Sequence, residues 1–487
     1  MAESNVSAAG FEPVIGLEIH AQLLTATKAF CGCGARFGGA PNAHVCPVCL
    51  GLPGALPVLN RRAVELAMRA GLALGCTIQH RSIFARKNYF YPDLPKGYQI
   101  SQYERPLATD GELVYEADDG PHATRILRVH LEEDAGKSLH VGTGDGDRHT
   151  YLDFNRSGVP LIEIVTHPDL RSPREAADFF VRLRAILLAI GVNDGNMEEG
   201  SLRCDANVSI RPVGTSALGV KVEVKNLNSF RFLQRAIEHE LVRQSEQLNA
   251  GAEVVQETRL WDEAAGRTAS MRSKEEAHDY RYFPEPDLPP LEVSDEWIAD
   301  VRAGLPELPD ARKQRFMRDY GLSATDAAQL ADTAELARFF EATAASAGNP
   351  KAACNWVMGE VTRRLKVEDA GIEAVGVSPD ALGRLIRLVD TGVINGSAAK
   401  SVFDHMYGSG REPDDIVQTE ALAQIGDEGE LNEVVARVIA EHTDAVARYL
   451  EGNEGSLGFL VGQVMRATRG RANPKLANEL LRRTLAD

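Results

Sequence analysis

Side chains that could bind metal and phosphate alternate with apolar ones along several segments of the sequence. Within residues 14–23, Glu18 and His20 fall on one side of an extended chain, with leucine and isoleucine on the other. Residues 127–132 present Glu132 on one side in the same way. Carboxylates suit Mg²⁺, whereas histidine is an unusual ligand for this ion. The alternative role for His20 is contact with a phosphate or with a carboxylate.

Two later segments add basic side chains to the oxygen ligands. In residues 202–211, Asp205 and Asn207 alternate with small apolar residues, and Lys221 and Lys225 share one side of the next segment. Lysine and arginine suit phosphates, and carboxylates suit Mg²⁺. The combination predicts a nucleotide-phosphate site on one face of a sheet.

One further carboxylate lies inside a strongly apolar run, because Glu163 is flanked by Leu161, Ile162, Ile164 and Val165. Burying a carboxylate is costly unless it is paired or binds a metal, which strengthens the prediction of a polar cavity. Any one of these strands also fits an antiparallel sheet with a solvated face, and that alternative stays open.

Four of the seven cysteines form two short-spaced pairs, Cys31 with Cys33 and Cys46 with Cys49. Two thiol pairs separated by twelve residues can close a tetrahedral Zn²⁺ site. Four thiolates leave no open coordination position, so the predicted zinc is structural. The first pair is more tightly spaced than usual, and the alternative is two buried or redox-active pairs.

Composition limits the class of protein. At roughly 150 residues per domain, 487 residues predict about three domains, and 44% hydrophobic and 25% charged residues are ordinary for a soluble protein. No apolar run approaches the ~18 residues of a membrane span, and the first ten residues resemble no targeting signal, so we expect a cytoplasmic protein with no membrane partner. The net charge of −17 argues against nonspecific coating of nucleic acid, although a local basic patch could still bind it.

Periodicity predicts where the helices begin and how the chain is divided. Three helices, expected after Asn60, Ser172 and Asn228, interrupt the strand-rich first part of the chain. Beyond the proline-rich stretch 283–291, helical patterns dominate. The glycine-rich stretch 407–413 is a candidate hinge. We predict an α+β fold in three parts: a strand-rich, mainly antiparallel cradle (1–295), an all-α helical domain (296–410) and a small α-helical tail (411–487).

Long runs spread over nearly the whole chain resemble one known family. The runs are residues 14–20, 86–93, 130–137, 198–207, 225–230, 279–287, 458–465 and 472–474. They are similar to the B subunit of the aspartyl/glutamyl-tRNA amidotransferases. This family has a strand-rich catalytic cradle followed by a helical domain and a helical tail.

The resemblance implies that the cradle binds ATP and Mg²⁺. The family's metal and nucleotide ligands carry over by motif to Glu18, His20, Glu132 and Glu163. Between Glu132 and Glu133, strand alternation favours Glu132. Asp205, Asn207, Lys221 and Lys225 are assigned to the nucleotide from their strand faces. The four cysteines match family members that bind zinc, and relatives without these cysteines agree with a structural role.

The implied activity is that of a ligase that forms C–N bonds with glutamine as the amide donor. ATP phosphorylates the side-chain carboxylate of Glu or Asp misacylated on tRNA(Gln) or tRNA(Asn), and ammonia converts the acyl phosphate to the amide. The sequence shows no amidase Ser-Ser-Lys signature and no cysteine-based glutaminase motif, so a partner must supply ammonia. The resemblance implies a heterotrimer with the family's amidase (A) and small (C) subunits. Either misacylated tRNA, or both, could be the substrate.

The end of the chain is basic although the protein is acidic. Residues 456–487 contain six lysines and arginines against two acidic residues. A solvated helical face is the alternative interpretation, but the resemblance favours tRNA binding. The predicted tRNA contacts are Arg466, Arg469, Arg471 and Lys475.

Two other functions fit parts of the sequence. The archaeal tRNA(Gln)-specific relative has a similar cradle but carries a synthetase-like insertion domain, for which 487 residues leave no room. A zinc-stabilised, tRNA-binding subunit without catalysis is the second. Under that interpretation, the acidic and histidine side chains would only form a solvated sheet face.

Overall fold

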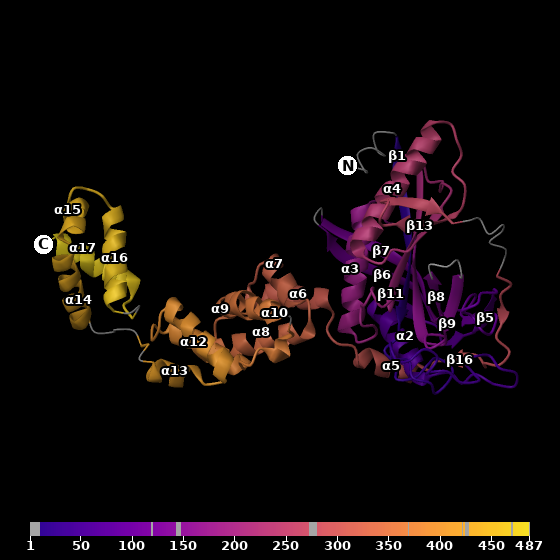
Figure 1. The fold of residues 1–487 in the computed structure, drawn as a ribbon, viewed down its shortest axis with the longest axis horizontal. Coiled ribbons are helices and arrows are strands. Elements are labelled where there is room, and N and C mark those ends of the chain that lie inside the picture. The colour runs from indigo at the N-terminus through magenta and orange to yellow at the C-terminus, as the bar shows by residue number, and fades with distance from the viewer. Residues whose placement is uncertain are drawn as a thin grey trace. The chain divides into compact units, whose positions relative to one another are not determined.

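The structure, a computed structural model, describes residues 10–117, 120–142, 148–271, 280–368, 370–420, 422–423, 428–468 and 471–486. Its contacts divide the chain into two compact units, Met1–Leu308 and Pro309–Asp487. Within the described residues, the strands lie in the first unit and the second is helical (Figure 1). The predicted α+β class is therefore confirmed.

The first unit contains sixteen described strands and four described α-helices. The strands are β1 (Phe11–Gln22), β2 (Thr77–Ile78), β3 (Arg81–Ser82), β4 (Ala85–Asn88), β5 (Tyr98–Ser101), β6 (Ala108–Ala117), β7 (Gly120–Glu133), β8 (Lys137–Gly142), β9 (Arg148–Asp153), β10 (Pro160–Thr166), β11 (Leu202–Pro212), β12 (Val222–Lys225), β13 (Thr258–Asp262), β14 (Arg267–Ser270), β15 (Phe283–Pro284) and β16 (Leu291–Glu292). The helices are α2 (Arg61–Ala73), α3 (Pro173–Ala189), α4 (Phe230–Asn249) and α5 (Asp295–Ala303).

Nine strands form the main sheet, in the order β14-β13-β12-β11-β1-β10-β7-β6-β2. Every pairing in it is antiparallel except that of β12 with β13, which is parallel. The central strand β1 lies between β10 and β11, its partners from much later in the chain. Three smaller sheets have the orders β15-β4-β5, β16-β3 and β8-β9.

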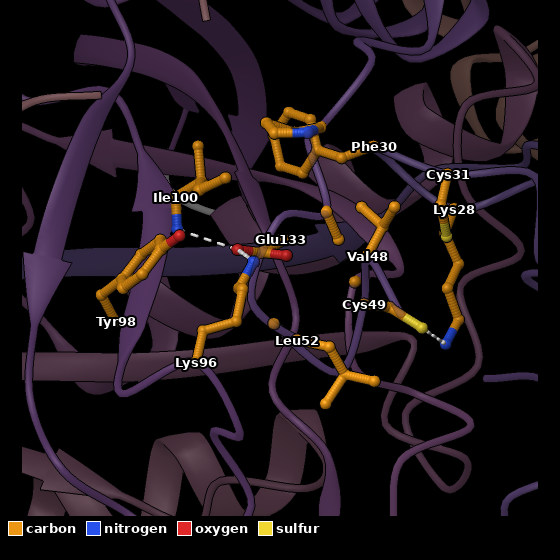
Figure 2. Close-up of a pocket in the computed structure, with 14 residues that line it drawn as sticks. Lys28, Phe30, Cys31, Val48, Cys49, Leu52, Lys96, Tyr98, Ile100 and Glu133 are labelled. Carbon is orange, nitrogen blue, oxygen red and sulfur yellow. Dashed lines mark hydrogen bonds and ion pairs between the residues drawn. The ribbon is translucent and has the colours of Figure 1, made fainter. Parts of the chain in front are cut away.

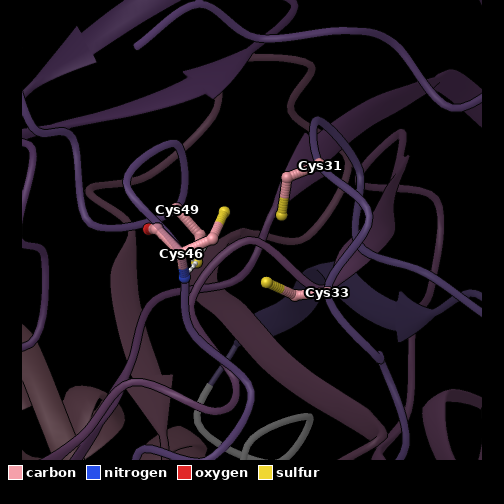
Figure 3. A group of neighbouring side chains, drawn as sticks. All are labelled: Cys31, Cys33, Cys46 and Cys49. Carbon is pink, nitrogen blue, oxygen red and sulfur yellow. Dashed lines mark hydrogen bonds between the residues drawn. The ribbon is translucent and has the colours of Figure 1, made fainter.

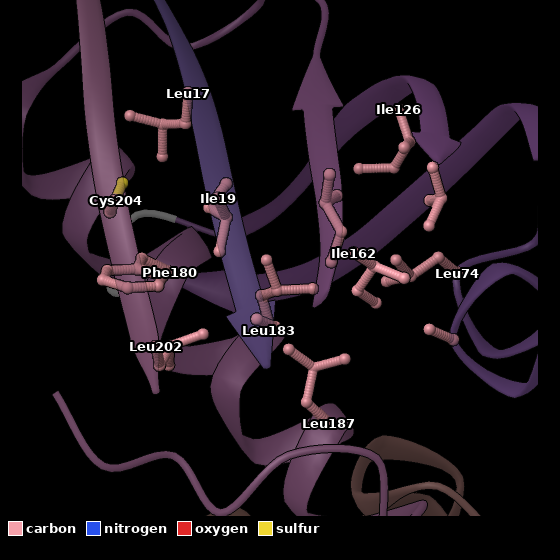
Figure 4. Close-up of a cluster of buried hydrophobic side chains, with 14 of the residues drawn as sticks. Leu17, Ile19, Leu74, Ile126, Ile162, Phe180, Leu183, Leu187, Leu202 and Cys204 are labelled. Carbon is pink, nitrogen blue, oxygen red and sulfur yellow. The ribbon is translucent and has the colours of Figure 1, made fainter. Parts of the chain in front are cut away.

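One face of the main sheet is apolar and is covered by helices. Leu17 and Ile19 of β1 pack with Phe180 and Leu183 of α3 (Figure 4). Helix α4 contacts both α3 and β11. Because side chains alternate along a strand, burying this face leaves the polar side chains of the same strands on the other. The candidate site therefore lies on the polar face of the sheet, opposite the hydrophobic core.

The helix starts in this unit follow the predicted capping signals. The side chain of Asn60 accepts hydrogen bonds from the first turn of α2, and Ser172 caps α3 through the Glu175 N–H. Ser229, one residue after the predicted Asn228, caps α4. The three predicted helices are confirmed.

The second unit is made of short helices. They are α6 (Pro309–Tyr320), α7 (Ala324–Leu330), α8 (Ala334–Ala347), α9 (Pro350–Trp356), the π-helix η1 (Val357–Val361), α10 (Thr362–Glu368), the 3₁₀-helix η2 (Ile372–Ala374), α11 (Pro379–Asp390), α12 (Gly396–Ser409), α13 (Pro413–Thr419), α14 (Glu428–Glu441), α15 (Thr443–Leu450), α16 (Gly455–Ala467) and α17 (Pro474–Ala486). Their buried side chains form two hydrophobic clusters, one from Phe316 to Val417 and one from Leu431 to Leu481. Within the described residues, no helix has the length and hydropathy needed to cross a bilayer.

Two groups of contacts lie near the domain boundaries expected from the sequence. Helix α5 contacts α2, and the first unit extends to Leu308 rather than residue 295. Helix α13 contacts α11 and α12, and Ile416 belongs to their core, so the stretch 407–413 is a tight connection within one cluster. Treating the two helical clusters as separate domains stays a prediction.

Candidate functional site

A row of polar side chains crosses four strands on the face of the main sheet opposite α3 and α4. Arg203 on β11 pairs in register with His20 on β1, His20 with Glu163 on β10, and Glu163 with His130 on β7. Glu132, two residues beyond His130 on the same side of β7, completes the cluster. The alternation predicted for three separate segments thus converges in one place.

The cluster contains two imidazoles and two carboxylates at short distances. His20 Nε2 lies 3.4 Å from Glu163 Oε2 and 3.6 Å from Glu132 Oε1. His130 Nε2 lies 3.5 Å from Glu163 Oε2 and 3.8 Å from Glu132 Oε2. Ligand atoms of His20, Glu132 and Glu163, one from each, fall within 4.8 Å of one another, so these residues can hold one divalent cation.

Burial and opposite charge both act on this cluster. Burial alone would raise the pKa of Glu163, but the charge and hydrogen bond of His130 and the hydrogen bond of His20 hold it well below its usual range. Burial would lower the pKa of His130, yet Glu163 and Glu132 raise it to about 9. Burial would also raise the pKa of Glu132, but the hydrogen bond and charge of His130 and the charge of His20 lower it. Both carboxylates are therefore ionised at neutral pH, the form that binds a metal ion.

A separate small sheet contributes two residues that sequence reasoning did not assign. Ser101 at the end of β5 donates a 3.0 Å hydrogen bond to Glu132 Oε2. Lys87 on β4 is half-buried; burial would lower its pKa, but the charges of Glu132, Tyr282 and Glu163 raise it. Lys87 lies in a run that resembles the family, which could have identified it, whereas Ser101 had no such signal.

The other predicted nucleotide contacts lie mainly in the neighbouring row. Glu18 is opposite Asp205 and accepts a 2.9 Å hydrogen bond from Asn207 Nδ2. Lys225 Nζ pairs with Asp205 at 2.9 Å and with Glu223 at 2.8 Å. Glu18 is outside the group of residues whose ligand atoms fall within 4.8 Å. Lys221 is exposed and precedes β12, which begins at Val222.

A buried aspartate connects this face to the adjoining loop. Asp134 Oδ2 accepts hydrogen bonds from Gln22 Nε2 at 2.7 Å and from Arg203 at 3.0 Å. Burial would raise its pKa, but the charges of Arg203 and Arg156 lower it. Arg203 and Asp134 therefore form an ion pair next to His20, and neither was among the site residues predicted from the sequence.

Glu133 points to the opposite side of β7 from Glu132. It is ion-paired with Lys96 and accepts a 3.0 Å hydrogen bond from the Ile100 N–H, beside a cavity of about 130 Å³ (Figure 2). His20 and Glu163 do not line this cavity. The geometry thus places Glu132, and not Glu133, in the histidine–carboxylate cluster, as alternation predicted.

The four clustered cysteines converge on one point in the loop after β1. Their sulfur atoms, from Cys31, Cys33, Cys46 and Cys49, lie within 4.8 Å of one another (Figure 3). The Cys46 and Cys49 sulfurs are 3.9 Å apart, close to the edge of about 3.8 Å that Zn–S bonds of about 2.3 Å give a tetrahedron. The Cys46 N–H also donates to Cys49 Sγ at 3.1 Å. The arrangement is compatible with zinc.

The thiols influence one another's ionisation. A hydrogen bond from Cys31, the Cys46 N–H and the charge of Lys28 lower the pKa of Cys49 to about 4 against the effect of burial. The same interaction raises the pKa of Cys31. A metal ion would remove this competition, because every thiol that binds it is deprotonated.

Basic residues of the tail lie near the turn between α16 and α17. Arg466 is exposed in the last turn of α16, and Lys475 is exposed in the first turn of α17. Arg471 is half-buried and donates to the Thr468 carbonyl oxygen at 3.3 Å. Arg469 lies outside the described residues. The chain connection brings the three described residues to one end of this helix pair.

Comparison with known families agrees with this division of sheet and helices. A model of the GatB/GatE catalytic domain matches residues 13–299, which contain the histidine–carboxylate cluster. A model of the GatB domain matches residues 338–485 in the helical unit. The class defined by the fold and site is therefore that of the GatB/GatE catalytic proteins.

Curated relatives are similar over almost their entire length. The chain is 55% identical to the B subunit of aspartyl/glutamyl-tRNA(Asn/Gln) amidotransferase from Anaeromyxobacter dehalogenans (strain 2CP-C), over 98% of this chain and 99% of that one. It is 54% identical to the B subunit of the same enzyme from Thermoanaerobacter sp. (strain X514), with the same coverage. The chain belongs to the family of aspartyl/glutamyl-tRNA(Asn/Gln) amidotransferase B subunits.

Proposed function

We propose that this chain uses ATP to phosphorylate the side-chain carboxylate of Glu or Asp misacylated on tRNA(Gln) or tRNA(Asn), and that the acyl phosphate is then amidated. The single observation that carries the chemical part is the row through His20, Glu163 and His130, completed by Glu132. Family membership supplies the substrate class, since the relatives are named for aspartyl/glutamyl-tRNA(Asn/Gln) amidotransferase activity.

The cluster fits a bound Mg²⁺ through its carboxylates. Glu132 and Glu163 would provide oxygen ligands, with His20 beside them, and Glu18 is the further candidate ligand in the next row. When bound, Mg²⁺ would neutralise charge on the phosphoryl oxygens. His130 and Ser101 orient the two carboxylates through their contacts with them.

Cationic side chains of the chain itself supply the remaining electrostatics. Lys87 keeps its proton beside Glu132 and Glu163, so its ammonium can stabilise charge that develops on a transferred phosphoryl group. Lys225, which is ion-paired with Asp205 and Glu223, provides a second cation on the same face. Asn207 lies near it on β11, and the exposed Lys221 directly precedes β12. We assign these residues to the nucleotide.

The amidation half-reaction depends on partners. Ammonia displaces phosphate from the acyl phosphate, forming the C–N bond and releasing inorganic phosphate. We assign its supply to the amidase (A) partner of a heterotrimer that also contains the small (C) partner. Arg466, Arg469, Arg471 and Lys475 are the proposed tRNA contacts in the tail. Cytoplasmic location follows from the proposed role in translation.

The cysteine cluster is proposed to hold one structural Zn²⁺. Four sulfur donors complete a tetrahedral site and leave no position for substrate, which supports a role in holding the loop after β1.

An ATP-hydrolysis assay with the reconstituted heterotrimer tests the proposal. ATP hydrolysis that depends on misacylated tRNA is expected, and Glu132→Gln should abolish it while the partner still hydrolyses glutamine. Glu112→Gln, which changes an exposed carboxylate on β6 of the same sheet, is the matched control. Full transamidation by Glu132→Gln would contradict the catalytic assignment and favour a tRNA-binding subunit without catalysis. Assays with each misacylated tRNA separately identify the substrate.

A further inference from the structure

A lysine is buried completely beneath the cysteine cluster. Lys28 is 0% exposed and is the one charged residue among the largest fully buried side chains in the described part of the chain. An ammonium group removed from water is costly unless opposite charge and acceptors surround it. Hydrogen-bond acceptors and negative charge around Lys28 must therefore offset the free-energy cost of removing its ammonium group from water.

All three donor directions of the Lys28 ammonium lead to a partner. Nζ donates to the His44 carbonyl oxygen at 2.7 Å and to the Phe154 carbonyl oxygen at 3.1 Å. It also approaches Cys49 Sγ at 3.6 Å (Figure 2). In addition, the backbone N–H of Lys28 donates to the Cys33 carbonyl oxygen at 2.9 Å. One residue thus contacts both cysteine pairs and the segment after β9.

The charge of a zinc site explains why a cation is needed there. Four thiolates around Zn²⁺ carry a net charge of about −2. Cys49 is itself buried, so water cannot screen that charge on the side that faces Lys28. The ammonium reduces the net charge and donates a charge-assisted hydrogen bond to one sulfur.

We propose that Lys28 is a positioning residue of the zinc site, which offsets part of the negative charge of the thiolate cluster and ties it to the turn between β9 and β10. This inference rests on the proposed zinc. The backbone carbonyl oxygens of His44 and Phe154 fix the ammonium, and the ammonium in turn fixes Cys49 Sγ. Lysine suits this position because a single flexible stem delivers three donors to three acceptors in two separate segments.

The turn held by Lys28 leads to the catalytic face. Ser157 Oγ donates to the Cys49 carbonyl oxygen at 3.3 Å, and the Gly158 N–H donates to the Asp134 carbonyl oxygen at 2.9 Å. Gly158 has a φ of +84°, and an added Cβ would lie 3.5 Å from atoms of both Cys49 and Lys28. The packing therefore connects the zinc loop, through Asp134, to the ion pair that Asp134 makes with Arg203.

Zinc binding by Lys28→Met in the full-length protein tests the inference. Methionine keeps the length of the side chain but removes the charge and the donors. We expect zinc affinity, measured by competition with a chromogenic chelator, to fall by about 10- to 100-fold. Replacing zinc with Co²⁺ should give an altered thiolate-to-metal charge-transfer spectrum. Thr25→Val, which removes a 2.7 Å hydrogen bond to the Thr27 carbonyl oxygen in the same loop without touching a thiol, is the control.

The possible results distinguish a failure of the proposed Lys28 role from a failure of the zinc proposal itself. Parent-like affinity and Co²⁺ spectrum in Lys28→Met would overturn the role of Lys28 while leaving the zinc proposal intact. A parent protein without zinc would overturn both. If Lys28→Met does not fold, Lys28→Arg is measured instead, because it retains the charge with a different geometry. An altered Co²⁺ spectrum at unchanged stoichiometry supports the inference, and an unaltered spectrum and affinity contradict it.

Discussion

His20 on β1 and Glu163 on β10 are paired in register, with the imidazole Nε2 3.4 Å from the carboxylate Oε2. The pair joins the central strand of the sheet to its neighbour on the face opposite α3 and α4. His130 on β7 contacts the Glu163 carboxylate, and Ser101 on β5 donates a hydrogen bond to the Glu132 carboxylate. Substitutions around this pair should therefore affect phosphoryl transfer in graded steps.

Lys87→Met and Ser101→Ala should differ in severity. Lys87 supplies a charge near the reacting group, and its loss is expected to lower kcat by about 100- to 1000-fold. Ser101 only donates one hydrogen bond to Glu132, so Ser101→Ala should cost about tenfold. Single-turnover transamidation measures both. Equal effects of the two substitutions would contradict a direct electrostatic role for Lys87.

The zinc proposal predicts one metal ion per chain, lost on changing two cysteines. Cys46→Ser combined with Cys49→Ser should reduce zinc from one per chain to none, with a modest fall in activity because the site holds a loop. Metal analysis by mass spectrometry checks the stoichiometry. Cys76→Ala is the control, since Cys76 is buried elsewhere in the same unit and should leave zinc unchanged.

Arg86 and Glu285 form a two-pronged ion pair that holds the segment containing β15 against β4. Their hydrogen bonds measure 2.7 and 2.9 Å, and the Glu285 side chain is fully buried. Glu285→Gln removes the buried charged partner of Arg86 and leaves only the partly exposed Asp287, and we expect the free energy of unfolding to fall by about 3 kcal/mol. Asp287→Asn, which breaks the more exposed contact of the same arginine, should cost less than about 1 kcal/mol. Urea denaturation distinguishes the two, and equal losses would contradict the ranking.

Acid should weaken the contact between β12 and β13. Burial would raise the pKa of Glu223, but Lys225 and the Thr258 hydroxyl lower it. A carboxyl group whose pKa is depressed by folding stabilises the protein above its unfolded-state value of about 4.3, and this contribution is lost as the pH falls through the lower folded-state value. Glu223→Gln should therefore destabilise by about 1 kcal/mol at pH 7 and by little at pH 3. Exposed Glu246→Gln is the control, and a loss independent of pH would show that ionisation is not the cause.

Basic residues of the tail should act on tRNA affinity and not on chemistry. The helices α14 to α17 share one core, so deleting only α16 and α17 would expose Leu431 and Val435, and point substitutions are the cleaner test. Arg466→Ala and Lys475→Ala should each raise Kd and flatten the log–log salt dependence by about one unit if each contacts a phosphate. Exposed Arg437→Ala on α14 is the control. Salt slopes equal to that of the parent would place the tRNA contacts elsewhere.

Local patterns predicted the parts of the site that lie on single strands. Alternation placed His20 and Glu132 on presented faces, an isolated carboxylate in an apolar run indicated Glu163, and cysteine spacing predicted the thiol cluster. Capping signals predicted the helix starts because a cap is a contact between neighbours in sequence. In each of these cases the physical cause lies within a short stretch of chain.

Residues that reach the site from distant parts of the chain could not be predicted from local sequence patterns. Lys87 and Ser101 come from a small sheet whose position against β7 depends on tertiary packing, and no periodicity reports that packing. Lys28 is one lysine in a loop, and only its complete burial reveals its role. The first compact unit extends beyond residue 295 for the same reason, because α5 looks like the start of the helical region in sequence but packs on α2.

The position of β1 at the centre of the sheet also matters while the chain is being made. This strand is synthesised before both of its partners, which begin at Pro160 and Leu202, so its two hydrogen-bonding edges stay unpaired until those segments have been made. Unpaired apolar strands are prone to associate with other chains. Newly made protein should therefore depend on protection of residues 11–22 until β11 emerges, and chains that end before Leu202 should aggregate rather than retain partial activity.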